Sequence, residues 1–149
     1  MNQVLDWLYV GSVKDAENYG ALKAEGIGAV LTLAWPIKHP DIAVRRVYFE
    51  DGEPISDEIF EKALSFVRQQ RRKGKKILIA CSAGVSRSPT IAVAVLHELE
   101  GYPLIEAFRT VLGRVHMACP RPVTWNSVCR FYGQMVTLGD VWRDKKEAI

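Results

Sequence analysis

The sequence has too few cysteines for a disulfide framework and lacks the spacing of a zinc site. Its three cysteines, Cys81, Cys119 and Cys129, are an odd number, and neither a CxxC pair nor a His/Cys cluster occurs. A chain of 149 residues, of which 48% are hydrophobic, can build a core without such cross-links. We therefore expect a reducing, cytoplasmic setting, with no metal and no cofactor.

Long apolar runs and a strong charge of one sign are also missing. No run approaches the ~20 residues of a membrane-spanning helix, and residues 1–11 lack the basic start and apolar stretch of a signal peptide. The net charge of +3 suits anionic substrates but is too small to indicate a nucleic-acid-binding surface. Without repeats or linkers, one domain over residues 1–149 is expected, with no nucleic-acid or membrane partner. The sequence leaves the oligomeric state open, and a monomer is the simpler expectation.

The hydrophobic pattern alternates between strand and helix. The expected strands cover residues 5–10, 28–34, 43–49 and 77–80, and the expected helices cover 13–25, 56–72, 90–99, 104–113 and 124–138. The strand at 77–80 is apolar on both sides, which is typical of a central strand covered by helices. The alternation predicts an α/β fold with a mostly parallel central sheet flanked by helices on both faces.

A basic run, RRKGKK at residues 71–76, follows the clearest amphipathic helix. We interpret it as a solvated helix end, whose positive charges complement the helix dipole and where Gly74 stops the helix. A membrane-surface or nucleic-acid patch is the alternative.

The segment ILIACSAGVSRSPT, residues 77–90, predicts an anion-binding loop. A strand stops at Cys81, small or uncharged residues follow, and Pro89 suits the first turn of a helix. The first N–H groups of a helix have no partner inside it, and its dipole favours negative charge there. Gly84 can adopt the positive φ that lets loop N–H groups turn inward around an oxyanion. The expected substrate contacts come from Ser82, Ala83, Gly84, Val85, Ser86 and Arg87, the last through its planar guanidinium.

We call the anion-binding loop of residues 81–87 the cup. Cys81 lies at its base and is the candidate nucleophile, although a lone cysteine is more commonly a buried core residue. A helix N-terminus and a nearby guanidinium both favour the reactive thiolate. The thiolate would lie in line behind a bound phosphorus atom, and phosphoryl transfer needs mainly positioning and charge stabilisation. Ser88 can donate a hydrogen bond to the sulfur, which helps it leave later. The loop is not a Walker A motif, because arginine replaces lysine and no metal is implied.

The stretch CSAGVSRS resembles the Cys-x-x-Gly-x-x-Arg-Ser/Thr loop of the cysteine-dependent protein phosphatases. The order of the surrounding elements, over roughly residues 4–138, looks like the small dual-specificity branch. The resemblance implies hydrolysis of phosphotyrosine, and of phosphoserine or phosphothreonine, in a phosphorylated protein through a cysteinyl-phosphate.

That resemblance also implies a general acid upstream of the loop. Asp51, thirty positions before Cys81, occupies the matching place. It would protonate the leaving oxygen and later activate water. Glu50, Glu53 and Asp57 are rivals, and a plain solvated acidic turn is the alternative.

Two positions depart from the family pattern. The family usually has histidine just before the cysteine, where this chain has Ala80. We expect a slower first step or a higher pH optimum as a result. Asn126 matches only loosely the asparagine of a late helix that braces the phosphate loop in the family.

Other functions remain open. A phosphoinositide or RNA 5′-phosphate phosphatase would use the same scaffold, although lipid-directed relatives often carry lysines in the loop and this chain has none there. Low-molecular-weight phosphatases, arsenate reductases and rhodanese-type sulfurtransferases fit the layout less well. A module that binds phosphoresidues without turnover is the alternative from another class.

Overall fold

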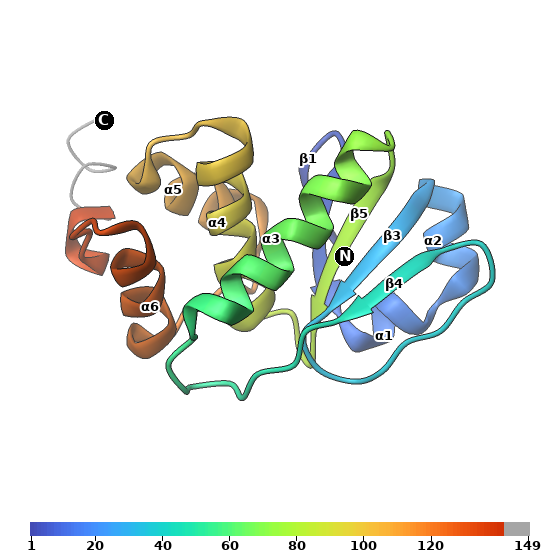
Figure 1. Cartoon of the computed structure of the whole chain (residues 1–149), viewed down its shortest axis with the longest axis horizontal. Helices are drawn as coiled ribbons and strands as arrows, with labels where there is room; N and C mark the ends of the chain where they lie inside the picture. Colours follow the sequence, from blue (N-terminus) through green and yellow to red (C-terminus); the bar gives the residue numbers. More distant parts are fainter. Residues whose placement is uncertain (142–149) are drawn as a thin grey trace.

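The computed structural model describes residues 1–141, and Figure 1 shows the whole chain. The strands are β1 (Asn2–Leu5), β2 (Leu8–Ser12), β3 (Ile27–Thr32), β4 (Ala43–Arg46) and β5 (Lys76–Cys81). The helices are α1 (Val13–Glu17), α2 (Tyr19–Glu25), α3 (Asp57–Arg72), α4 (Arg87–Glu100), α5 (Leu104–Arg114) and α6 (Pro122–Tyr132).

The five strands form one sheet in the order β1-β2-β5-β3-β4. β5 is central and pairs in parallel with β2 and β3, and β4 pairs in parallel with β3. The buried apolar residues of β5 explain its central position, because helices cover this strand on both faces of the sheet. β1 joins the edge antiparallel to β2. The predicted mostly parallel α/β sheet is confirmed.

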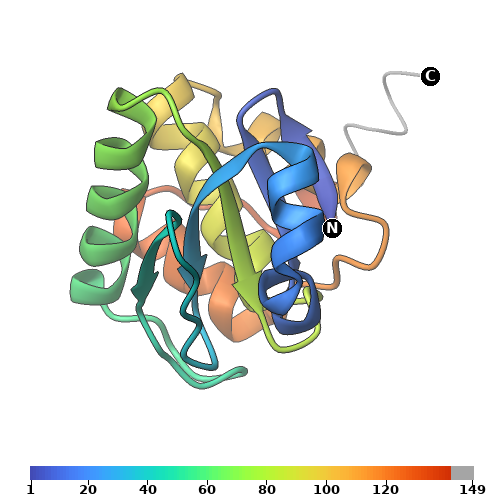
Figure 2. The same cartoon turned by 90° about the vertical axis from the view of Figure 1, so that its right-hand side faces the viewer.

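Helices lie on both faces of the sheet. Figures 1 and 2 show α1 and α2 on one side and α3 and α4 on the other, with α5 and α6 beyond α4. The larger apolar cluster lies between the sheet and α3 and α4, while a smaller one lies under α1 and α2. Within residues 1–141, no helix combines the length and the apolar character needed to cross a membrane.

Two predicted helices have different bounds in the structure. The helix expected over 13–25 is divided at Asn18, because Asn18 leaves helical geometry and its side chain accepts a hydrogen bond from the N–H of Ala21, which starts α2. The helix expected over 124–138 ends at Tyr132. Gly133 follows with a φ of +62°, a left-handed conformation that terminates helices, and its N–H caps the last carbonyls.

Two predicted strands also differ. The strand expected over 5–10 is two strands, since β1 ends at Leu5 and β2 begins at Leu8. β4 ends at Arg46, three residues earlier than expected, although the N–H of Val47 still bonds to the carbonyl of Thr32. From there the chain leaves the sheet and forms an irregular loop before α3.

Candidate active site

The loop between β5 and α4 lies where three parallel strands end. Ser12 at the end of β2 pairs with Cys81, and Thr32 at the end of β3 pairs with Ala80. Because parallel strands share one carboxyl edge, the segments that follow β2, β3 and β5 meet there. Open α/β sheets commonly bind ligands at this edge.

Cys81 is buried, with 2% of its surface exposed, and its sulfur faces the start of α4. The backbone N–H of Ser88 donates to Sγ at 3.3 Å, and the Ser88 hydroxyl lies 3.1 Å from the same atom. The Ser88 hydroxyl also lies 3.2 Å from the carbonyl oxygen of Gly11. The hydroxyl therefore has two possible acceptors, a sulfur and a carbonyl.

Gly84 gives the loop its curvature. Its φ is +73°, and a Cβ there would lie 2.9 Å from the carbonyl carbon of Gly11. Only glycine fits both conditions without displacing backbone. The corner between β2 and α1 thus supports the loop from behind. Ser12 fixes that corner with a capping box, in which it exchanges hydrogen bonds with Asp15.

The rest of the cup combines exposed and buried residues. Ser82 and Ala83 are exposed, while Ser86 is buried and precedes α4. Among residues 1–141, the Ser86 hydroxyl has no hydrogen-bond partner. The structure thus brings all six predicted loop residues to the N-terminus of α4.

The guanidinium of Arg87 is buried and joins three segments. Nη1 donates to the carbonyl of Phe49 at 2.9 Å and to that of Leu33 at 3.3 Å. Nη2 donates to the hydroxyl of Ser82 at 2.9 Å, across the mouth of the cup. Arg87 therefore closes the cup and ties it to the segment that carries the acidic candidates.

Asp51 lies at the rim of the cup. A cavity of about 270 Å³ is lined by Ala34, Trp35, Arg46, Tyr48, Glu50, Asp51, Ser82 and Arg87. Of the four acidic candidates, this cavity includes Asp51 and Glu50 but neither Glu53 nor Asp57. Glu50 accepts a hydrogen bond from the hydroxyl of Tyr48, and this contact raises the pKa of that phenol. Asp51 instead pairs with Arg121, with 3.3 Å between Oδ2 and Nε.

Ala80 is fully buried against the smaller apolar cluster, under α1 and α2. Its carbonyl accepts the N–H of Leu33 at 2.8 Å.

The match proposed for Asn126 is wrong. Asn126 is exposed on α6 and lines a different cavity, with Trp125, Cys129 and Met135. It faces outward because its neighbours Trp125 and Ser127 take the buried face of the helix.

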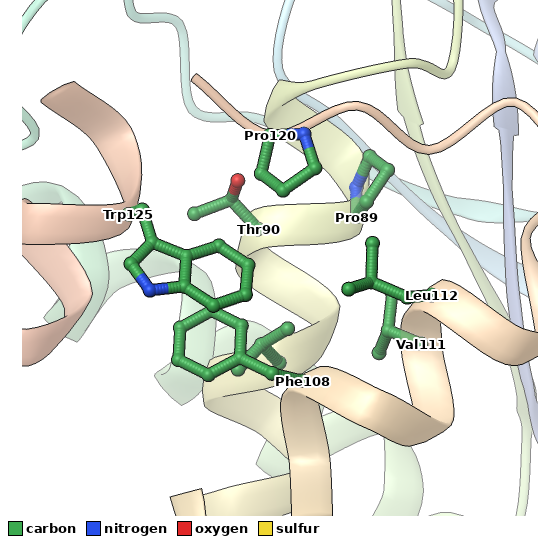
Figure 3. A pocket seen from close by; sticks show the side chains of 8 residues that line it. Pro89, Thr90, Phe108, Val111, Leu112, Pro120 and Trp125 are labelled. Carbon is green, nitrogen blue, oxygen red and sulfur yellow. The ribbon is translucent and has the colours of Figure 1, made fainter. Parts of the chain in front are cut away.

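The segment between α5 and α6 braces the loop in a way the sequence did not indicate. The N–H of Cys119 donates to the carbonyl of Val85 at 2.7 Å. Next to it, Pro120 lies close to Pro89 at the start of α4 and to the stacked rings of Trp125 and Phe108 (Figure 3). Trp125 is thus a packing residue, with 2% of its surface exposed.

Sequence reasoning also missed the residues that contact the cup and Asp51 from elsewhere in the chain. Gly11, the carbonyl of Phe49 and Arg121 all come from distant segments. The sequence contains Asp15 three residues after Ser12, a spacing that suits a capping box, but its place behind the cup follows only from the pairing of β2 with β5. Within residues 1–141, no group of three or more His, Cys, Asp or Glu side chains is arranged to hold a metal ion.

Comparison with known proteins gives one consistent family. The model described as "Dual specificity phosphatase, catalytic domain" matches residues 8–134. Dual specificity protein phosphatase 1B of Arabidopsis thaliana is 33% identical over 126 residues, which cover 82% of this chain and 75% of that protein. Dual specificity protein phosphatase 1 of the same plant is 35% identical over 117 residues, 76% of this chain and 59% of that protein. The matched residues therefore span 75% of the length of the first relative and 59% of the length of the second.

Solved structures show the same fold. Human DUSP28 has a TM-score of 0.83 at 24% identity, with 89% of this chain and 96% of that chain covered. DUSP15 has a TM-score of 0.80 at 22% identity, with 99% and 95% covered.

Proposed function

The chain belongs to the dual specificity phosphatase family of cysteine-dependent protein phosphatases, and from this premise we propose that it hydrolyses phosphotyrosine and phosphoserine or phosphothreonine through a cysteinyl-phosphate. One observation carries the proposal. The sulfur of Cys81 lies at the start of α4, where it accepts a hydrogen bond from the Ser88 N–H and lies 3.1 Å from the Ser88 hydroxyl, with Arg87 across the mouth of the cup.

Binding begins with the phosphate in the cup. Its oxygens accept hydrogen bonds from the loop N–H groups and from the guanidinium of Arg87, whose fork matches two oxygens. The buried hydroxyl of Ser86 gains a partner if it turns to the same anion. These donors also stabilise the charge of the transition state, which is the main task in phosphoryl transfer.

In the first step, the thiolate of Cys81 attacks phosphorus. The S–P bond forms while the bond from phosphorus to the substrate oxygen breaks, and Asp51 transfers its proton to the leaving oxygen. A tyrosine phenol ordinarily titrates near pH 10, and a serine hydroxyl is weaker still as an acid, so this proton matters for both kinds of substrate.

In the second step, water attacks the cysteinyl-phosphate. The carboxylate of Asp51 takes a proton from the water, the new P–O bond forms, and the S–P bond breaks. The departing sulfur carries negative charge. The Ser88 hydroxyl stabilises it by turning from the Gly11 carbonyl to Sγ.

The proposed substrate follows from the shape of the cavity beside the cup. The cavity is open, and two exposed aromatic residues, Trp35 and Tyr48, line it. An aryl phosphate gains contact with these rings, while the open mouth also admits the shorter phosphoserine and phosphothreonine. We further propose a cytoplasmic, monomeric enzyme without nucleic-acid or membrane partners and without metal or cofactor.

The test is phosphate release from a panel of phosphopeptides, phosphoinositides and 5′-triphosphate RNA. We expect turnover of phosphopeptides by the native chain, loss with Cys81→Ser, and a reduction of about 100-fold or more with Asp51→Asn. Preference for a phosphoinositide or for RNA would replace the proposed substrate. Tight phosphopeptide binding without release would instead indicate a binding module.

A further inference from the structure

We propose that Arg121 is a positioning residue that holds Asp51 in place over the cup for proton transfer. The inference rests on the proposed function, because it requires Asp51 to be the general acid. Its starting observation is the contact between Nε of Arg121 and Oδ2 of Asp51, at 3.3 Å. Arg121 does not line the cavity that holds Arg87 and Ser82, so its effect on the reaction must pass through Asp51.

The backbone of the segment that carries Asp51 is held by hydrogen bonds before and after Asp51. Before it, the carbonyl of Phe49 accepts from Arg87. After it, the N–H of Ile55 donates to the hydroxyl of Ser127, and Arg130 donates to the carbonyl of Ile55. Between these anchors the N–H of Glu53 donates to the carbonyl of Glu50 at 3.4 Å, which closes a turn around Asp51 and holds its backbone but not its side chain. Arg121 therefore supplies the contact that fixes the carboxylate.

Arg121 is itself held relative to the cup. It is the N-cap residue of α6, and its carbonyl accepts from the N–H of Trp125 at 3.0 Å and from the hydroxyl of Thr124 at 2.9 Å. Two residues earlier, Cys119 bonds to Val85 within the cup. One short segment thus contacts both the cup and the candidate acid.

Gly52 lets the arginine side chain approach. A Cβ at Gly52 would lie 3.5 Å from Cδ of Arg121 and 3.7–3.8 Å from its Nη1 and Nε, so the side chain lies directly over this backbone. Gly52 has a φ of +81°, a conformation that favours glycine. The turn and the arginine therefore fit together as a unit.

Positioning of an acid has a distinctive kinetic consequence. A displacement of about 1 Å can cost about 100-fold when proton transfer limits the step. The loss depends on the leaving group, because a nitrophenolate departs without a proton whereas a phenolate needs one. A residue that merely stabilised the fold would affect both leaving groups equally.

The experiment measures kcat and KM of Arg121→Gln for phenyl phosphate and p-nitrophenyl phosphate. We expect kcat/KM, which reports the steps up to formation of the cysteinyl-phosphate, to fall about tenfold for phenyl phosphate and to change by less than about twofold for p-nitrophenyl phosphate. Arg121→Lys, which keeps the charge, should restore part of the loss. Arg72→Gln is the matched control, because it removes an exposed arginine from the far end of α3.

The Asp51→Asn background separates the two proposals. There, Arg121→Gln should cause no further loss with phenyl phosphate. If Asp51→Asn lowers the phenyl phosphate rate but Arg121→Gln does not, the positioning role fails and the acid assignment stands. An equal fall of kcat/KM with both substrates, or a rise of kcat/KM for phenyl phosphate, also overturns the positioning role. If Asp51→Asn changes neither rate, the acid assignment fails together with this inference.

Discussion

The Ser88 hydroxyl faces both the sulfur of Cys81 and the carbonyl of Gly11, and it has one proton for the two. While Cys81 is a thiol, its S–H can donate to Ser88 and the hydroxyl can donate to Gly11. When the sulfur carries charge, a hydrogen bond to it is the stronger one. The hydroxyl therefore matters most when the sulfur leaves.

Ser88→Ala should slow hydrolysis of the cysteinyl-phosphate more than its formation. The Ser88 N–H still reaches the sulfur in this variant, so the first step is preserved. Stopped-flow measurement with p-nitrophenyl phosphate should show a burst of nitrophenol followed by a steady state that is about tenfold slower. Ser88→Thr, which keeps the hydroxyl, is the control. A slow reaction without a burst would contradict this role.

Ala80 precedes Cys81 at the position where the family pattern has histidine. In the structure, apolar side chains surround Ala80. We expect Ala80→His, which restores the histidine of the family pattern, to make Cys81 more reactive in mild acid. Iodoacetate should alkylate the variant faster than the native chain at that pH. Equal alkylation rates, in a variant whose circular dichroism matches the native chain, would show that this position does not control the sulfur.

At the scale of elements, the strand and helix pattern was predictable where one periodicity extended over many residues. α3 and α5 appear within about two residues of their expected bounds, because each has an apolar face that packs on the core. Asn18 and Gly133 interrupt helices that periodicity alone would continue. β1 was missed because a four-residue edge strand is defined by its partner β2 more than by its own residues.

α6 supports the acid loop through Ser127. The Ile55 N–H donates to the Ser127 hydroxyl at 2.9 Å, and both groups are buried. Ser127→Ala leaves that N–H without a partner, so the free energy of unfolding should fall by about 1–3 kcal/mol. Urea unfolding measures this. Ser65→Ala, an exposed site on α3, should change stability by less than about 0.5 kcal/mol. Equal stability of the two variants would contradict the argument.

For the molecule as a whole, residues 81–88 were predictable as a site because they are contiguous in the sequence, whereas their supports are not. Gly11 and the carbonyl of Phe49 reach the cup only through the parallel pairing of the strands and the path of the chain after β4. Arg121 reaches Asp51 only because α6 packs beside α4. Nothing in local composition specifies such distances. The roles of the site residues remain predictions.

The corner between β2 and α1, behind the cup, also makes the free energy of unfolding depend on pH. Partial burial opposes ionisation of Asp15, but the hydrogen bond from the Ser12 N–H and the charge of the N-terminal ammonium outweigh it, so the pKa of Asp15 lies below its ordinary value. A lowered folded-state pKa gives stability that is present above the unfolded-state pKa, about 3.9, and is lost as pH falls through the folded-state pKa.

Asp15→Asn should therefore lower stability at neutral pH and lose that effect in acid. Thermal unfolding of both proteins at neutral pH and near pH 2 measures the difference. Asp6→Asn, which changes an exposed carboxylate outside the corner, is the control. A difference that persists at the lower pH would show that Asp15 acts through packing alone.

The two outer strands have a consequence for how copies of the chain meet in concentrated solution. β1 and β4 are the margins of the sheet, and each has only four residues. β4 also carries Arg45 and Arg46, both exposed. A second sheet aligned there would gain few backbone hydrogen bonds and would bring like charges together. These edge strands are therefore poor templates for aggregation. The apolar strands between them could still promote aggregation if the sheet were exposed by partial unfolding.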